Sequence, residues 1–437
     1  MGFNIILSIF FLLLLLPINK IQTRKDFKIV KIFKKSILYS INTNFGYLQS
    51  LENKVLGENG FFMNGEMIFI KMTDLGRFID LKKLEKILPG IYIKELVITR
   101  DTPKYIYIPK PLIVELTLSE NLDAPYIKNI ILQERIYEDG VLSMIARISF
   151  ENVPLNQLHT VRKIEFSTPD GRFKISKWID FHFNDIYSKI KDYVEDYMYK
   201  ITPMEHEKYI IYCITDPLNP YDIIESNKNY FATLLMGESF DKELNESQIK
   251  NTLANPFSYL KNDIVIFDLE RALIFDEYRD YNDIILITEL ANYQLLELRS
   301  LDHILDVQLD KAEDDIRKMV SESHNVLSKL TAKYSSEFRK IIRMRFDMIF
   351  ILENLENISK ILGDYYLAQI YTHLSKLFEL HQWSESIRHR LETIEDIYSI
   401  FKSNINEKIL LYVETLLAVV FVLEFVFFIL GLFIKVN

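Results

Sequence analysis

Hydrophobic and polar positions alternate along the first part of the chain. From about 40 to 183, short runs rich in β-branched and aromatic residues alternate with polar positions, which is typical of half-buried strands. Turn residues over 138–140 and 168–171 predict two hairpins. The predicted strands cover 90–98, 104–108, 112–118, 130–137, 141–150, 161–166 and 172–183. With a helix expected over 184–200, residues 36–202 are predicted to form an α+β domain of mainly antiparallel strands.

The pattern changes near Thr202-Pro203, and a second, smaller α/β domain is predicted over 203–282. Its predicted elements are a buried strand over 209–214, helices over 227–236 and 247–254, and a hairpin formed by 263–268 and 272–275.

The pattern becomes helical from about residue 283. No proline follows Pro256, and proline is the residue that most strongly breaks helix interiors. Apolar residues at a heptad-like spacing predict a first helix to about 328, a second over 332–361 and a third from Asp364. Residues 283–408 are therefore expected to form a helical stalk or coiled-coil bundle.

Residues 409–434 are 26 predominantly apolar positions without Lys or Arg. As a helix they reach about 39 Å, which is enough to cross a hydrocarbon core of about 30 Å. The alternative is a buried core helix, but such helices are rarely apolar on all sides. A C-terminal transmembrane helix is therefore expected.

The first 19 residues form a shorter apolar stretch, which we expect to be a retained membrane segment. A cleaved signal, an interfacial segment and a wrong start codon stay as alternatives. Residues 20–35 carry seven Lys or Arg against one acid, so the positive-inside rule places this flank in the cytoplasm. The bulk of the chain is accordingly expected in the cytoplasm, at the plasma or inner membrane of a prokaryote.

Composition narrows the function. The 437 residues carry a formal net charge of −9, which argues against nucleic acid as a partner. The single cysteine excludes an intramolecular disulfide and a cysteine-rich zinc site. Phosphate-binding, dinucleotide-binding, zinc-protease and nucleophile-elbow motifs do not occur, so we predict no catalytic, cofactor-binding or metal-binding residues.

The last half of the chain resembles the YagE-type family named "required for meiotic nuclear division". The resemblance rests on Glu414 and Glu424, ten residues apart in YVETLLAVVFVLEF, on the helix over 291–299 and on the strand with Tyr212-Cys213. It covers roughly 207–437 and departs from the family at Thr415, where an aromatic is usual. The resemblance implies a membrane-anchored protein, with eukaryotic members in mitochondria, and implies no catalytic residues.

Glu424 is the strongest single candidate for a functional residue. It would lie near the middle of the bilayer, where an ionisable group costs roughly 2.5–3.5 kcal/mol. It would serve either a functional role or a hydrogen bond between neighbouring helices in its protonated form. Both readings favour a homo-oligomer formed through the C-terminal helices. Glu414 would lie near the interface, within reach of water.

Four other features have weaker functional interpretations beside a plain structural one. His381, Glu385 and His389 share a helix stripe that could bind zinc or simply face solvent. A stripe of Asp302, Asp306 and Asp310 is expected to face solvent or to pair with Arg343 and Arg345 of a neighbouring helix, and a cation site is the functional alternative. The basic run 339–345 touches anionic lipid or is ordinary helix surface. Cys213 is expected to be a buried, unreactive thiol.

The sequence favours a membrane-anchored structural or interaction protein. One alternative is a channel- or transport-related oligomer that uses Glu424, although the Gly-Met-Asn signature of divalent-cation channels does not occur. The other is an enzyme with a cleft between the two α/β domains.

Overall fold

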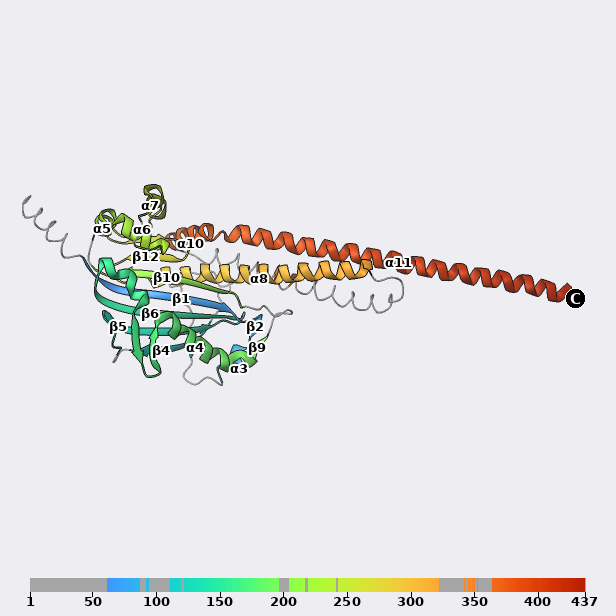
Figure 1. Cartoon of the computed structure of the whole chain (residues 1–437), viewed down its shortest axis with the longest axis horizontal. Helices are drawn as coiled ribbons and strands as arrows, with labels where there is room; N and C mark the ends of the chain where they lie inside the picture. The colour runs from blue at the N-terminus through green and yellow to red at the C-terminus, as the bar shows by residue number, and fades with distance from the viewer. Residues whose placement is uncertain are drawn as a thin grey trace, which may run out of the picture. The chain divides into compact units, whose positions relative to one another are not determined.

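A mixed sheet of eight strands is the centre of the protein, seen here in a computed structural model (Figure 1). The structure describes residues 61–86, 92–93, 111–118, 122–195, 204–216, 219–240, 243–321 and 364–436, and six isolated positions between 342 and 352. All elements below belong to the unit Phe62–Asn437.

Each of the eight strands runs antiparallel to at least one neighbour, and β10 with β12 is the one parallel pair among these described strands. The strands, in spatial order, are β11 (Ile264–Phe267), β12 (Arg271–Phe275), β10 (His206–Ile214), β1 (Phe62–Asp74), β6 (Val141–Pro154), β5 (Ile127–Ile136), β4 (Leu112–Leu118) and β3 (Tyr92–Ile93). The predicted α+β class with a mainly antiparallel sheet followed by helices is confirmed.

Strands from the two predicted α/β segments lie in this one sheet. β10, β11 and β12 come from the segment 203–282, and β10 pairs along its length with β1 of the earlier segment. The two segments therefore share one set of backbone hydrogen bonds.

Helices cover both faces of the sheet. Ile68, Ile70 and Met72 alternate along β1 and pack against the first face's helices, whereas Met67 and Phe69 point to the opposite face. The first face carries α8 (Asn282–Ser321), α10 (Tyr365–Leu377) and α11 (Leu380–Val436). On the opposite face lie α4 (Ile175–Ile190) and the 3-10 helix η2 (Leu155–Lys163), with Trp178 of α4 buried edge-on against Phe166.

The remaining elements are short. They are β2 (Phe78–Ile79), α3 (Leu81–Leu84), β7 (Glu165–Thr168), β8 (Gly171–Lys174), η3 (Lys191–Tyr193), β9 (Val194–Glu195), α5 (Pro220–Ser226), α6 (Lys228–Met236) and α7 (Glu246–Thr252).

The hairpin predicted around residues 138–140 is confirmed. Tyr137 N donates to Val141 O at 2.8 Å, and Gly140 has φ +95°, a conformation that favours glycine. A Cβ at Gly140 would also lie 1.7 Å from Gly76 O, so the turn requires glycine for space as well.

The strand predicted over 172–183 is wrong beyond its first residues. β8 ends at Lys174, and Ile175, Trp178 and Ile179 begin the buried face of α4. Their spacing of three and four fits a helix, whereas the prediction followed the turn chemistry before them. The hairpin predicted around 168–171 is confirmed, because β7 pairs with β8 and Thr168 lies opposite Gly171. Its first strand begins only at Glu165, since 161–163 belong to η2, and the helix predicted over 184–200 ends at Ile190.

The long helices agree with the sequence in part. α8 matches the predicted start near 283, and Asp364 caps α10 by accepting from Tyr366 N at 2.8 Å. One continuous third helix is wrong, because Glu379 has φ +55° and separates α10 from α11. The helix predicted over 332–361 lies, apart from isolated positions, outside the described residues, as does the segment 1–19.

The end of α11 is long and apolar enough to cross a membrane, judged by length and composition. Ile409–Ile429 has a mean hydropathy of 2.4, and none of it is buried. A buried core helix, the alternative for this segment, would be covered on at least one face. Within the described structure that alternative is therefore wrong.

Candidate functional site

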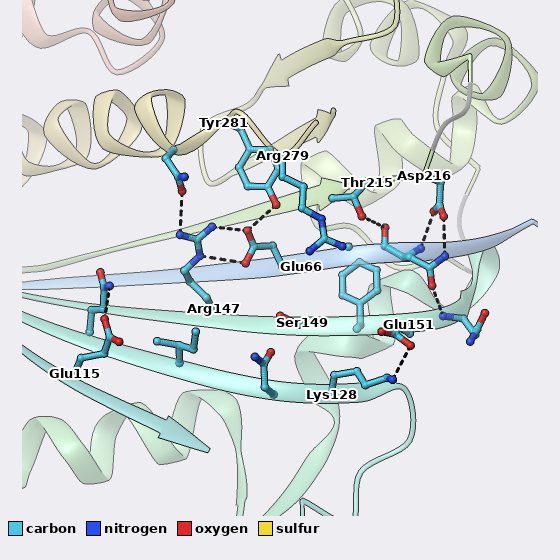
Figure 2. Close-up of a pocket in the computed structure, with 18 residues that line it drawn as sticks. Glu66, Glu115, Lys128, Arg147, Ser149, Glu151, Thr215, Asp216, Arg279 and Tyr281 are labelled. Carbon is cyan, nitrogen blue, oxygen red and sulfur yellow. Dashed lines mark hydrogen bonds and ion pairs between the residues drawn. The ribbon is translucent and has the colours of Figure 1, made fainter. Parts of the chain in front are cut away.

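A polar hollow of about 1040 Å³ opens on the first face of the sheet, at the start of α8 (Figure 2). Under α8 this face is apolar, because β1 presents Ile68 and Ile70 there. Two residues earlier on β1, the same face presents the polar residue Glu66. Because alternate residues share a face, the register brings Glu66 beside the polar residues of β6 and β5. The hollow is thus the part of this face that α8 does not cover.

An ion pair forms the wall nearest α8. Arg147 donates to Glu66 through Nε at 3.0 Å and through Nη2, and its Nη1 donates to Asn282 Oδ1 at 3.0 Å (Figure 2). The buried Tyr281 hydroxyl donates to Glu66 Oε1 at 2.6 Å. Burial, with the Glu66 carboxylate beside it, raises the pKa of Tyr281, so the phenol stays a donor throughout the neutral range.

Two further carboxylates are held in place around the rim. Asp216 accepts from the backbone N and the Nδ2 of Asn64, both at 2.7 Å. Glu151 pairs with Lys128 Nζ at 2.8 Å. These contacts fix the carboxylates but leave them accessible to solvent.

A chain of hydrogen bonds links the hollow to the underside of α8. Gln133 donates to Glu115 at 2.8 Å and accepts from Arg135 at 2.8 Å. Arg135 also pairs with Glu289 of α8, which is 1% exposed and accepts from Tyr137 and Ser143 at 3.0 Å each. The floor of the hollow is therefore rigidly connected to the helix that borders it.

Three polar groups that line the hollow lack a hydrogen-bond or ion-pair partner among the described residues. Among the described residues, nothing pairs with the Arg279 guanidinium, and the Ser149 hydroxyl makes no hydrogen bond. Asn129 Oδ1 is buried and likewise has no hydrogen-bond partner in the described part of the chain. Arg279 also has φ +58°, which side-chain-bearing residues rarely adopt.

A second polar cluster lies further along α8. Glu297 is 1% exposed, and its Oε1 has no hydrogen-bond partner within the described ranges. Burial, together with nearby Asp74 and Asp139, raises its pKa well above the usual value. Burial also raises the pKa of Asp139 to about 7, and Asp139 accepts from Tyr293. At neutral pH this cluster retains protons.

The sequence-predicted candidates lie away from the hollow. Glu414 and Glu424 are in the exposed end of α11, and no described residue packs on that end. His381 Nε2 lies 3.3 Å from Glu385 on an exposed stripe that also carries His389. Cys213 is buried in β10 as predicted, and burial raises its pKa.

The acidic stripe on α8 pairs across helices, but with another partner than predicted. Arg390 of α11 lies 3.2 Å from Asp302 and pairs with Asp306, whereas Arg345 pairs with Glu395. Asp310 is exposed. Arg343 and most of the run 339–345 lie outside the described residues.

Sequence reasoning missed the residues that build the hollow. One signal was available: Glu66, Arg147 and Glu289 each stand at an inward position in an otherwise apolar run. Charged residues are rarely buried unless they are paired, so an acid and a base inside neighbouring strands predict a contact.

Comparison with known proteins shows a similarity over this sheet and hollow. Residues 64–281 match the family described as "Uncharacterized protein MJ0711, N-terminal domain". The "Uncharacterized protein MJ0711" of Methanocaldococcus jannaschii is 26% identical over 222 residues, which are 50% of this chain and 65% of the relative. The chain thus covers less than two thirds of that relative's length. No solved structure matches the chain.

The match overturns the resemblance of residues 207–437 to the YagE-type family. The matched segment includes the strands before residue 207, for which the YagE-type family has no counterpart. It does not include the helix over 291–299 or the end of α11, on which the resemblance mainly rested. The resemblance misled for a physical reason. An apolar helix with two acidic residues is built from few residue types, so similar patterns recur in unrelated proteins. Every residue that lines the hollow, except Asn282, falls within the matched segment.

Proposed function

We propose that this protein is a membrane-anchored structural or interaction protein, in which the apolar end of α11 spans a bilayer and holds the α+β body beside it. The observation that carries the proposal is the complete exposure of Ile409–Ile429. An apolar helix exposed on all sides is unfavourable in water, whereas a bilayer covers it at once.

The connection between anchor and body also supports the proposal. α11 is one helix from Leu380 to Val436, and its first turns pack on α8 through Ile387, Leu391 and Ile394. The ion pairs of Arg390 with α8 lie in the same stretch. A stalk packed in this way limits how far the body moves from the membrane.

We place the body on the cytoplasmic side. The support comes from the sequence, since residues 20–35 carry seven basic residues and one acid. We further propose that copies of the chain associate through their apolar helices, since Glu424 would otherwise meet only lipid.

Membrane fractionation tests the anchor. The full-length protein, expressed in bacterial cells, is expected in the membrane fraction and resists extraction with alkaline carbonate. The double variant Leu417→Arg with Phe421→Arg adds two charges near the middle of the segment, each costing roughly 2.5–3.5 kcal/mol, and is expected to shift protein out of the membranes.

The matched control places the same two charges elsewhere. Leu260→Arg with Leu269→Arg changes two exposed apolar residues outside α11 and is expected to leave the distribution unchanged. A native protein that stays soluble, or that carbonate releases completely, contradicts the proposal.

A further inference from the structure

We propose that the hollow beside the start of α8 binds a small polar molecule through an anionic oxygen group, a phosphate or a carboxylate, that pairs with Arg279. This inference is independent of the membrane anchor, because the hollow lies on the sheet and α11 contributes no residue to it.

The first argument is the pairing of charges. Seven charged residues line the hollow, and six of them already have a hydrogen-bond or ion-pair partner; these six are Glu66, Glu115, Lys128, Arg147, Glu151 and Asp216. Arg279 alone has none among the described residues. A guanidinium offers a planar set of donors that matches the oxygens of a carboxylate or a phosphate.

The second argument is the backbone. The left-handed conformation of Arg279 is held by Asp276, whose carboxylate accepts from Tyr278 N and Asp280 N at 2.8 Å each. In this conformation the Arg279 side chain extends over the sheet, above the Glu66 side of the hollow (Figure 2). Strained conformations persist where the surrounding structure imposes them, and they concentrate at ligand-binding positions.

The third argument is the rest of the lining, which defines the kind of ligand. Its three basic and four acidic residues sum to −1, so the hollow does not attract polyanions. The carboxylates of Glu115, Glu151 and Asp216 can accept from hydroxyl or amino groups, and the Ser149 hydroxyl makes no hydrogen bond to a described residue. The ligand therefore combines one anionic group with several hydroxyl or amino groups, as a sugar phosphate or an amino acid does.

Calorimetric titration of the full-length protein in mild detergent tests the proposal with four probes. Glycerol 3-phosphate and inorganic phosphate represent the phosphate source, and serine and acetate represent the carboxylate source. Chloride at equal ionic strength is the blank. We expect saturable binding of glycerol 3-phosphate or serine that exceeds the binding of the corresponding simple anion.

Variants assign the binding to Arg279. Arg279→Gln is expected to weaken binding at least tenfold, and Arg279→Lys less. Arg172→Gln removes an exposed arginine of β8 and is expected to change nothing. Arg279→Gly removes the guanidinium and suits the left-handed backbone, so binding is lost while the unfolding temperature does not fall. If none of the probes binds saturably, or if Arg279→Gln binds as the native protein does, the proposal is wrong.

Discussion

At the scale of single residues, this protein places charge in its interior and pairs it. Glu289, on the underside of α8, pairs with Arg135 and accepts hydrogen bonds from two hydroxyl groups, so its charge is compensated. Glu297, two turns further along the same helix, meets the acids Asp74 and Asp139 instead. The two glutamates share a helix face but differ in what the sheet presents to them.

Glu297→Gln is expected to stabilise the protein, and more at pH 8 than at pH 5. The pKa of Glu297 is raised in the folded state, so its stabilising contribution is complete below about 4.5 and is lost as pH rises towards the folded pKa. Glutamine keeps the shape and never ionises. We expect a gain of roughly 1–2 kcal/mol at pH 8, measured as the thermal midpoint at both pH values.

The exposed Glu392 of α11 provides the comparison for this measurement, as Glu392→Gln makes the same chemical change outside the cluster. A Glu297→Gln effect that is equal at both pH values, or a loss of stability at pH 8, would show that the cluster does not hold protons as described.

At the scale of elements, the left-handed residue between α10 and α11 sets where the last long helix begins. Glu379 ends α10 with N donating to Lys376 O at 3.2 Å, and its carbonyl accepts from Trp383 N in the first turn of α11. A glutamate with positive φ is sterically strained, whereas a glycine in the same conformation is not.

Glu379→Gly is therefore expected to stabilise the protein by about 0.5–1 kcal/mol, since relief of strain exceeds the added entropy of the unfolded chain. Glu385→Gly, in the exposed interior of α11, is expected to destabilise by about 1 kcal/mol. Thermal unfolding of both variants measures the difference. Equal signs for the two substitutions would contradict the role assigned to Glu379.

At the scale of the whole molecule, the sheet and the apolar end of α11 differ in how far other described residues cover them. The described helices cover both faces of the sheet and leave the polar hollow open to solvent. The apolar end has no cover among the described residues. A bilayer would cover its apolar side chains, and a second copy would give Glu424 a hydrogen-bond partner, as proposed above.

Cross-linking in membranes is expected to yield species larger than the 51.8 kDa monomer. Glu424→Leu would remove the proposed hydrogen bond between helices, which is worth about 1–2 kcal/mol, so association is expected to weaken about tenfold. Glu414→Leu, nearer the end of the apolar run, serves as control and should weaken it less. A protein that is monomeric in membranes, or whose association is unchanged in Glu424→Leu, would contradict self-association through this helix.

The sequence by itself determined the local elements and the class of the fold. Alternation identified strands such as β5 and β6, turn chemistry identified their hairpin at Gly140, and helical spacing identified where α8 and α10 begin. These features follow from interactions within a few residues, which is why spacing reveals them. Where two local signals competed, as over 172–183, the prediction failed.

Only the tertiary structure decided which distant residues meet. Glu66, Arg147 and Tyr281 lie on different elements and form one network because the sheet register aligns them. Arg279, in the turn before α8, lies above this polar floor and has no partner in the part of the chain that the structure describes. Such long-range pairings depend on how strands order and where a helix begins to cover them, and no local pattern encodes either. The hollow could therefore not be located from the sequence, although each of its charged residues was visible there.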